Sequence, residues 1–395
     1  MLDIEKKTQF NQILLHIADA LDISESQYKE VVEKYKAVGE WLDKKDSPLS
    51  LFSPEIYPQG SFNLGTVVKP ATHEDKYDID LVCQLGISKD QTTQQQLKKM
   101  VGDRLKANKI YARMLDTEGR KCWTLEYADD AKFHMDILPA ISDDFDWLIG
   151  LDVPYEFAMH AICITDKDRW HLDRDWPHSN PKGYAAWFRQ RMIVAFETRK
   201  KFLAEQLRAN IEEVPDYKVK TPLQRAIQVL KRHRDIMFSN DPDEKPISII
   251  ITTLAAQTYN NETNLYDALV SVVNGMPGHI KSRNGVLWVP NPVDPGENFA
   301  DKWQEHPDRA AKFRKWLVQV GKDITAALEY QGIHEIAHAL KPAFGEKALN
   351  DAMVTYGEKI KKHRQNGRLK MAAGTGTLGA VGQTDVRNHT FYGRL

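Results

Sequence analysis

Apolar and polar residues alternate in three short stretches of the first half of the chain, and this alternation predicts β-strands. The stretches are Asp78–Leu85, Cys122–Tyr127 and Lys132–Leu138. Apolar residues spaced three or four apart predict amphipathic helices over 3–22 and from Ser24 to about Leu42. The second half of the chain mostly follows this helical spacing. The pattern therefore predicts an α+β protein with a helical C-terminal part.

Two of the predicted strands carry acids on their polar face. Asp78 and Asp80 are one residue apart, so both carboxylates point away from the apolar side. Asp136 has the same setting in the stretch that follows a predicted turn at Asp129-Asp130, and it can face the other two acids if its strand lies beside theirs. Carboxylates this close repel one another unless a cation binds between them, and Mg²⁺ prefers hard oxygen ligands. The sequence therefore predicts a magnesium site.

Three carboxylates on neighbouring strands suit nucleotidyl transfer, which uses two metal ions roughly 4 Å apart. We assign Asp78 and Asp80 to both ions, and Asp136 mainly to the ion that activates the attacking hydroxyl. Whether Asp136 also accepts the proton depends on geometry. Two Mg²⁺ ions are the expected cofactors, with Mn²⁺ as the alternative.

Candidate phosphate ligands lie outside these strands. Glycine at Gly60 lets a phosphate approach the backbone closely, and the Ser61 hydroxyl adds a donor. Lys231 lies on a helix opened by Thr221-Pro222, and Ser248 lies in the first turn of the next helix. We expect these four residues to contact the triphosphate.

Composition limits the partners. The chain has 395 residues and a formal net charge of −1, so no global basic field attracts long nucleic acid. No apolar run approaches the roughly 20 residues that span a bilayer, and the N-terminus lacks a signal-peptide pattern. We therefore expect a cytoplasmic protein with no membrane partner.

The order of these motifs resembles the DNA polymerase β-like nucleotidyltransferase superfamily, and within it the bacterial CD-NTases, which are similar to animal cyclic GMP-AMP synthase and DncV. The resemblance covers roughly residues 50–360. The motifs that carry it are Gln59-Gly60-Ser61-Phe62, Asp78-Ile79-Asp80-Leu81, His134-Met135-Asp136-Ile137, Ser179-Asn180-Pro181-Lys182-Gly183, Leu230-Lys231-Arg232-His233-Arg234-Asp235, Lys245-Pro246-Ile247-Ser248 and the segment 291–299.

The resemblance implies a bilobal enzyme: a catalytic lobe with N-terminal helices over 1–170, an oligoadenylate-synthase-like helical lobe over 171–371, and a flexible tail over 372–395. It implies that nucleoside triphosphates, with ATP among them, are cyclised into a di- or trinucleotide second messenger for anti-phage signalling. It adds Gln59 to the nucleotide-binding residues. It also implies a HORMA-type regulator or a partner conjugated to the C-terminus.

Alternative functions remain open at this point. A nucleotidyltransferase of this type can act on RNA or on a small-molecule hydroxyl, and a non-catalytic nucleotide sensor can share the fold. His334, Glu335 and His338 form an HExxH zinc-peptidase motif, although a helix with solvent-facing histidines explains it as well. The GxGxxG at 374–379 has too little chain after it for a dinucleotide site, so we read its glycines as flexible.

Overall fold

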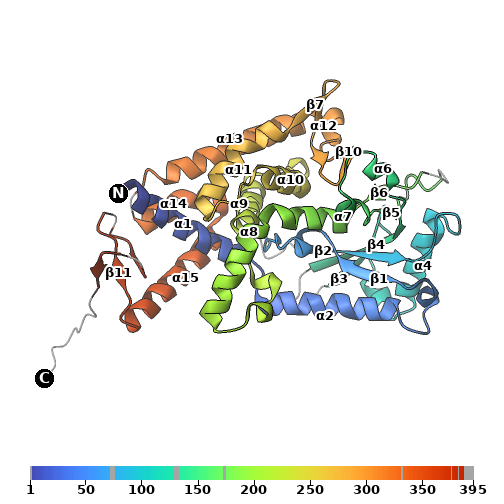
Figure 1. The fold of residues 1–395 in the computed structure, drawn as a ribbon, viewed down its shortest axis with the longest axis horizontal. Coiled ribbons are helices and arrows are strands. Elements are labelled where there is room, and N and C mark those ends of the chain that lie inside the picture. The colour runs from blue at the N-terminus through green and yellow to red at the C-terminus, as the bar shows by residue number, and fades with distance from the viewer. Residues whose placement is uncertain are drawn as a thin grey trace. The chain divides into compact units, whose positions relative to one another are not determined.

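The computed structural model describes residues 2–71, 76–127, 133–171, 175–330, 332–374, 376–380 and 382–386. These residues pack into two compact units (Figure 1). One unit comprises 23–193 and 290–299 and is called the sheet unit here. The other comprises 1–22, 194–289 and 300–395 and is called the helical unit. An α+β architecture was predicted from the sequence and is confirmed.

The sheet unit is built on a six-stranded mixed sheet with the order β1-β2-β4-β5-β6, in which β3 also pairs with β4. Strands β2 and β4 run parallel, while β3 and β5 are antiparallel to β4. The expected strand next to Asp78 and Asp80 is therefore β4. The predicted turn at Asp129-Asp130 lies outside the described residues. The elements of this unit are α2 (Glu25–Leu42), η1 (Pro48–Phe52), β1 (Glu55–Pro58), α3 (Gly60–Asn63), β2 (Tyr77–Leu85), α4 (Gln94–Lys106), α5 (Tyr111–Met114), β3 (Trp123–Tyr127), β4 (Phe133–Ser142), α6 (Asp146–Ile149), α7 (Tyr155–Ala158), β5 (Ile162–Ile164), β6 (His178–Ser179), the start of α8 (Pro181–Leu207), β9 (Pro290–Asn291) and β10 (Asp294–Asn298).

One face of this sheet forms the main core of the unit. Ile79 and Leu81 of β2 and Met135 of β4 are fully buried there, together with apolar residues of α2 and α4. Helix α2 begins where the sequence predicted, because Ser24 and Gln27 form a capping box. Since side chains alternate along a strand, burying this face leaves the acids on the other face.

The helical unit surrounds α9, which contacts α1, α10, α11, α13 and α14. The predicted start of α9 is confirmed, because Thr221 caps the helix and Pro222 occupies its first turn. The elements of this unit are α1 (Leu2–Leu21), the end of α8, η2 (Ile211–Glu213), η3 (Asp216–Lys218), α9 (Pro222–Met237), η4 (Pro242–Glu244), α10 (Ser248–Thr258), α11 (Leu265–His279), β7 (Lys281–Arg283), β8 (Val286–Trp288), α12 (Lys302–Glu305), α13 (Pro307–Ala327), α14 (Ile333–Phe344), α15 (Glu346–Gln365), β11 (Lys370–Met371), β12 (Leu378–Gly379) and β13 (Thr384–Asp385).

The packing of the two units differs from the expected lobe boundaries. Helix α1 belongs to the helical unit, because its apolar residues pack against α9, α11 and α15. The hairpin β9–β10 belongs to the sheet unit although it lies far along the chain. Within the expected tail, β12 and β13 both pair with β11, so part of 372–395 forms a small sheet. These long-range contacts leave no signal in local hydrophobic patterning.

Candidate active site

The predicted acids lie on one face of β2 and β4. Asp80 and Asp136 are directly paired across the two parallel strands, and Asp78 is paired with His134. Asp80 and Asp136 are half-buried, whereas Asp78 is exposed. The structure therefore brings the three acids to one stretch of the sheet surface, where the alternation of each strand predicted them to be.

The Gly60-Ser61 segment follows β1 and lies against Asp80. The backbone amide of Gln59 donates to the carbonyl of Asp80 at 2.8 Å. Gly60 has a φ of +61°, and a Cβ at that position would lie 2.2 Å from Oδ2 of Asp80. Phe62, the next residue but one, is buried and stacks on Tyr28. Only glycine lets the backbone at residue 60 lie this close to the Asp80 carboxylate, because any side chain there would clash with it.

Two residues beside the acids were not singled out from the sequence. Thr124 on β3 is paired with Asp136, and its hydroxyl donates to Oδ1 of that acid at 2.5 Å. Burial raises the pKa of the Cys122 thiol to about 12, and the nearby charges of Asp136 and Asp80 contribute to this increase. The signal for Thr124 was available, because it alternates with the buried Trp123 and Leu125.

The other two predicted phosphate ligands belong to the helical unit. Lys231 is buried on α9, and Ser248 is the first residue of α10. The guanidinium of Arg234 donates to the Ser248 hydroxyl at 2.8 Å and to the carbonyl of Pro246 at 3.0 Å. Arg234, which the sequence placed in a motif but gave no role, thus adds a cation beside Ser248. The triphosphate contact of Lys231 and Ser248 stays a prediction.

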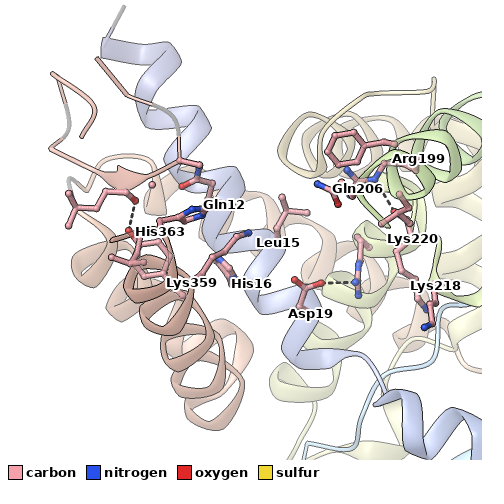
Figure 2. A pocket seen from close by; sticks show the side chains of 18 residues that line it. Gln12, Leu15, His16, Asp19, Arg199, Gln206, Lys218, Lys220, Lys359 and His363 are labelled. Atoms are coloured by element: carbon pink, nitrogen blue, oxygen red, sulfur yellow. Dashed lines mark hydrogen bonds and ion pairs between the residues drawn. The ribbon is translucent and has the colours of Figure 1, made fainter. Parts of the chain in front are cut away.

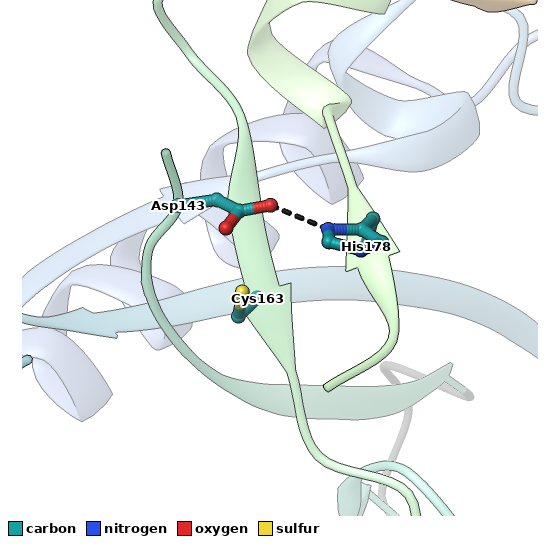
Figure 3. Close-up of side chains that lie close together, drawn as sticks. All are labelled: Asp143, Cys163 and His178. Carbon is teal, nitrogen blue, oxygen red and sulfur yellow. Dashed lines mark hydrogen bonds and ion pairs between the residues drawn. The ribbon is translucent and has the colours of Figure 1, made fainter. Parts of the chain in front are cut away.

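A different set of metal-ligating side chains gathers at β5 and β6. Among the described residues, Asp143, Cys163 and His178 form the one group of three whose ligand atoms lie within 4.8 Å of one another (Figure 3). Lys89 lies 2.5 Å from Asp143, so an ammonium already neutralises this carboxylate. Burial alone would raise the pKa of Asp143, but hydrogen bonds from His178 and Lys89 hold it well below its usual range. We interpret this group as a structural ion network.

The sequence assigned the three acids of β2 and β4 to two metal ions. Asp78, Asp80 and Asp136 do not form such a compact group within the described part of the chain. Two ions roughly 4 Å apart need their ligands spread more widely than one ion does. The role of these three acids as ligands of two metal ions therefore stays a prediction.

The competing motifs have structural explanations. His334, Glu335 and His338 lie on α14, whose buried face is formed by other residues, including Ile336 and Leu340. Within the described residues they belong to no group of three metal-ligating side chains. In the GxGxxG segment the amide of Gly374 donates to Glu5 at 2.7 Å, and the last two residues form β12.

The comparisons with known proteins agree with the geometry. Residues 54–139 match the family described as cyclic GMP-AMP synthase DncV-like, nucleotidyltransferase domain. Over 390 residues the chain is 30% identical to a c-di-GMP synthase of Roseivirga ehrenbergii, with 98% of both chains covered. The CD-NTase CdnG of Bradyrhizobium diazoefficiens, solved in complex with GTP, aligns with a TM-score of 0.68 at 21% identity, covering 88% of this chain and 99% of CdnG. A CdnC:HORMA-deltaN complex from E. coli MS115-1 aligns with a TM-score of 0.59 at 14% identity, covering 85% of this chain and 96% of the matched chain.

The fold and the matched domain define a nucleotidyltransferase, an enzyme class that uses a divalent metal ion. More narrowly, the chain belongs to the bacterial CD-NTase family. It is a synthase that cyclises nucleoside triphosphates into a second messenger for anti-phage signalling, which confirms the function predicted from the sequence. No helix in the described ranges is long and apolar enough to cross a membrane.

Proposed function

We propose that this enzyme joins two molecules of GTP into cyclic di-GMP. The relative that covers almost the whole chain is a c-di-GMP synthase, and CdnG was solved with GTP. These two relatives favour GTP as the substrate, rather than the ATP that we expected from the family resemblance. Each of two successive attacks by a ribose hydroxyl on an α-phosphate forms one phosphodiester and releases one pyrophosphate, so the second attack closes the ring.

The observation that carries the proposed site is the pairing of Asp80 with Asp136 across β2 and β4. We assign Asp78 and Asp80 to two Mg²⁺ ions and Asp136 mainly to one of them. Bound metal ions would lower the pKa of the attacking hydroxyl and neutralise the charge that grows on the α-phosphate. The hydrogen bond from Thr124 holds one oxygen of Asp136, and the other oxygen would bind the metal ion. Asp136 then accepts the proton of the attacking hydroxyl.

The triphosphate would bind beside Asp80. Gln59 and Gly60 present backbone close to that acid, and Ser61 supplies a hydroxyl donor. The Asp80 carboxylate fills the space that a Gly60 side chain would need, so a phosphate would contact this segment through its backbone amides and the Ser61 hydroxyl. Lys231 and Ser248 of the helical unit are also proposed to contact a triphosphate, with Lys231 acting as a point charge.

We also propose a protein partner and a cellular location for this enzyme. CdnC was solved with a HORMA protein, which supports a regulator of that type for this chain. The C-terminal residues expected to bind or be conjugated to a partner lie outside the described residues. A cytoplasmic location and Mg²⁺, with Mn²⁺ as the alternative, complete the proposal.

Product analysis tests the proposal. The protein is incubated with Mg²⁺ and GTP, ATP or both, and phosphatase-resistant products are identified by mass spectrometry. We expect cyclic di-GMP from GTP alone. Asp136→Asn should abolish it, whereas Asp90→Asn, which removes an exposed acid of the same unit, should not. A ring formed only when ATP is present, linear products alone, or no product with Mg²⁺ or Mn²⁺ would contradict the proposal.

A further inference from the structure

A second concave site lies wholly within the helical unit. It is a pocket of about 430 Å³ lined by α1, the end of α8, α15, the start of α9 and the segment 218–220 that precedes α9. Figure 2 shows His16 and Lys359 on one side of it and Arg199 and Lys220 on the other. None of the residues proposed for catalysis or nucleotide binding lines this pocket.

The charged groups that line the pocket are mostly positive. They comprise five cationic side chains, Arg199, Lys218, Lys220, Arg225 and Lys359, and one carboxylate, Asp19. Arg225 binds Asp19 at 2.6 Å, so the acid that lines the pocket is already paired with one of the cations. Asp22, behind the lining, also pairs with Arg225 at 3.1 Å and with Lys220 at 3.3 Å, so the two acids offset part of the charge and positive charge remains in excess.

Burial makes this excess of positive charge in the pocket energetically unfavourable. Burial lowers the pKa of Lys220, and the neighbouring Arg225 lowers it further, although Asp22 at 3.3 Å partly offsets the effect. Burial and Arg225 also lower the pKa of Arg199. On the other wall, burial and the charge of Lys359 lower the pKa of His16. Like charges held together in a partly desolvated site are stabilised when an anion binds among them.

The same pocket also offers apolar surface. Leu15, Leu203 and Ile360 contribute to its lining, and Phe202 is 50% exposed beside them. An exposed aromatic ring next to several cations suits a ligand that has both an anionic group and an apolar part.

We propose that this pocket binds a small molecule in which an oxyanion group, phosphate or carboxylate, is attached to an apolar ring. The cations on both walls bind the oxyanion, and Phe202 with the neighbouring leucines contacts the ring. The proposal is independent of the product that the enzyme makes, because the residues involved belong to the helical unit and not to the acid-bearing sheet.

Calorimetric titration of the full chain tests the proposal. Three probes are used with EDTA present: AMP, which joins a phosphate to a ring; phthalate, which joins carboxylates to a ring; and inorganic phosphate, which has no ring. We expect AMP or phthalate to bind with a Kd below about 1 mM and inorganic phosphate to bind more weakly. Raising the salt concentration should weaken binding, because it screens the cations.

Charge-removing variants locate the bound probe. Arg199→Gln combined with Lys359→Gln should raise the Kd at least about tenfold, a loss of about 1.4 kcal/mol. The matched control combines Lys201→Gln and Lys361→Gln, which remove exposed charges from the same helices outside the pocket. Lys359→Gln alone, at an exposed position, should raise the Kd without affecting folding. No binding of any probe up to about 10 mM, or the same loss in the control, would overturn the proposal.

Discussion

Gly60 has an unusual backbone conformation and lies against an acid of the candidate active site. Its left-handed φ and its contact with Asp80 each disfavour a side chain. We expect Gly60→Ala to lower activity at least about 100-fold, because displacing the Asp80 carboxylate by even about 1 Å disrupts the reacting geometry. Synthesis rates measured with GTP and Mg²⁺ check this.

Gly285→Ala is the matched control for Gly60→Ala. Gly285 also has a positive φ, of +81°, but a Cβ added there would meet nothing within 4 Å. Both variants should therefore lose about 1–2 kcal/mol of unfolding free energy from backbone strain. Only Gly60→Ala should lose activity. Equal activity in the two variants would show that the contact with Asp80 has no role in synthesis.

Thr124 offers a residue-scale test of how Asp136 is positioned. We expect Thr124→Val to reduce kcat by about 10- to 100-fold, which is the usual cost of removing a partner that orients a metal ligand. Thr124→Ser keeps the hydroxyl and should retain most of the activity. The KM for GTP should change little, since Thr124 contacts the acid rather than the substrate. If valine and serine gave the same kcat, the hydrogen bond would not matter to catalysis.

At the scale of elements, the packing of α4 against β3 holds the strand that carries Thr124. A Cβ on Gly102 of α4 would lie 2.2 Å from Cζ2 of the buried Trp123, whose indole nitrogen donates to the carbonyl of Lys98 at 2.9 Å. Gly102→Ala should therefore lower the unfolding free energy by about 1–3 kcal/mol through overpacking. Chemical denaturation measures the change.

The control for this helix position is Gly357 of α15, where an added Cβ would meet nothing within 4 Å. Gly357→Ala should raise the unfolding free energy by about 0.5–1 kcal/mol, because alanine favours the helix over glycine. If both variants were stabilised, α4 would have to be free to move away from β3.

At the scale of the whole molecule, ligand binding should couple to stability. A ligand that binds only the folded state at about 100 times its Kd stabilises that state by about 2.7 kcal/mol. We expect Mg²⁺ with a non-hydrolysable GTP analogue to raise Tm by several degrees. Asp80→Ala should abolish this increase, and its ligand-free Tm should stay within a few degrees of the wild type or rise, because carboxylate repulsion is relieved. An increase that persists in Asp80→Ala would refute the metal assignment.

The sequence by itself determined the local elements and the candidate acids of this protein. Alternation along β2 and β4 placed Asp80 and Asp136 on the polar faces of their strands, and the caps at Ser24 and Thr221 fixed where two helices begin. These features depend on neighbours in the chain, so a one-dimensional pattern contains them.

Only the tertiary structure decided which distant segments meet. It paired Asp80 with Asp136, placed Thr124 on Asp136, assigned α1 to the helical unit, and assembled the basic pocket from side chains of α1, α8, α9 and α15. Strand register and helix packing depend on how all buried surfaces fit together at once, and no local stretch of sequence contains that information.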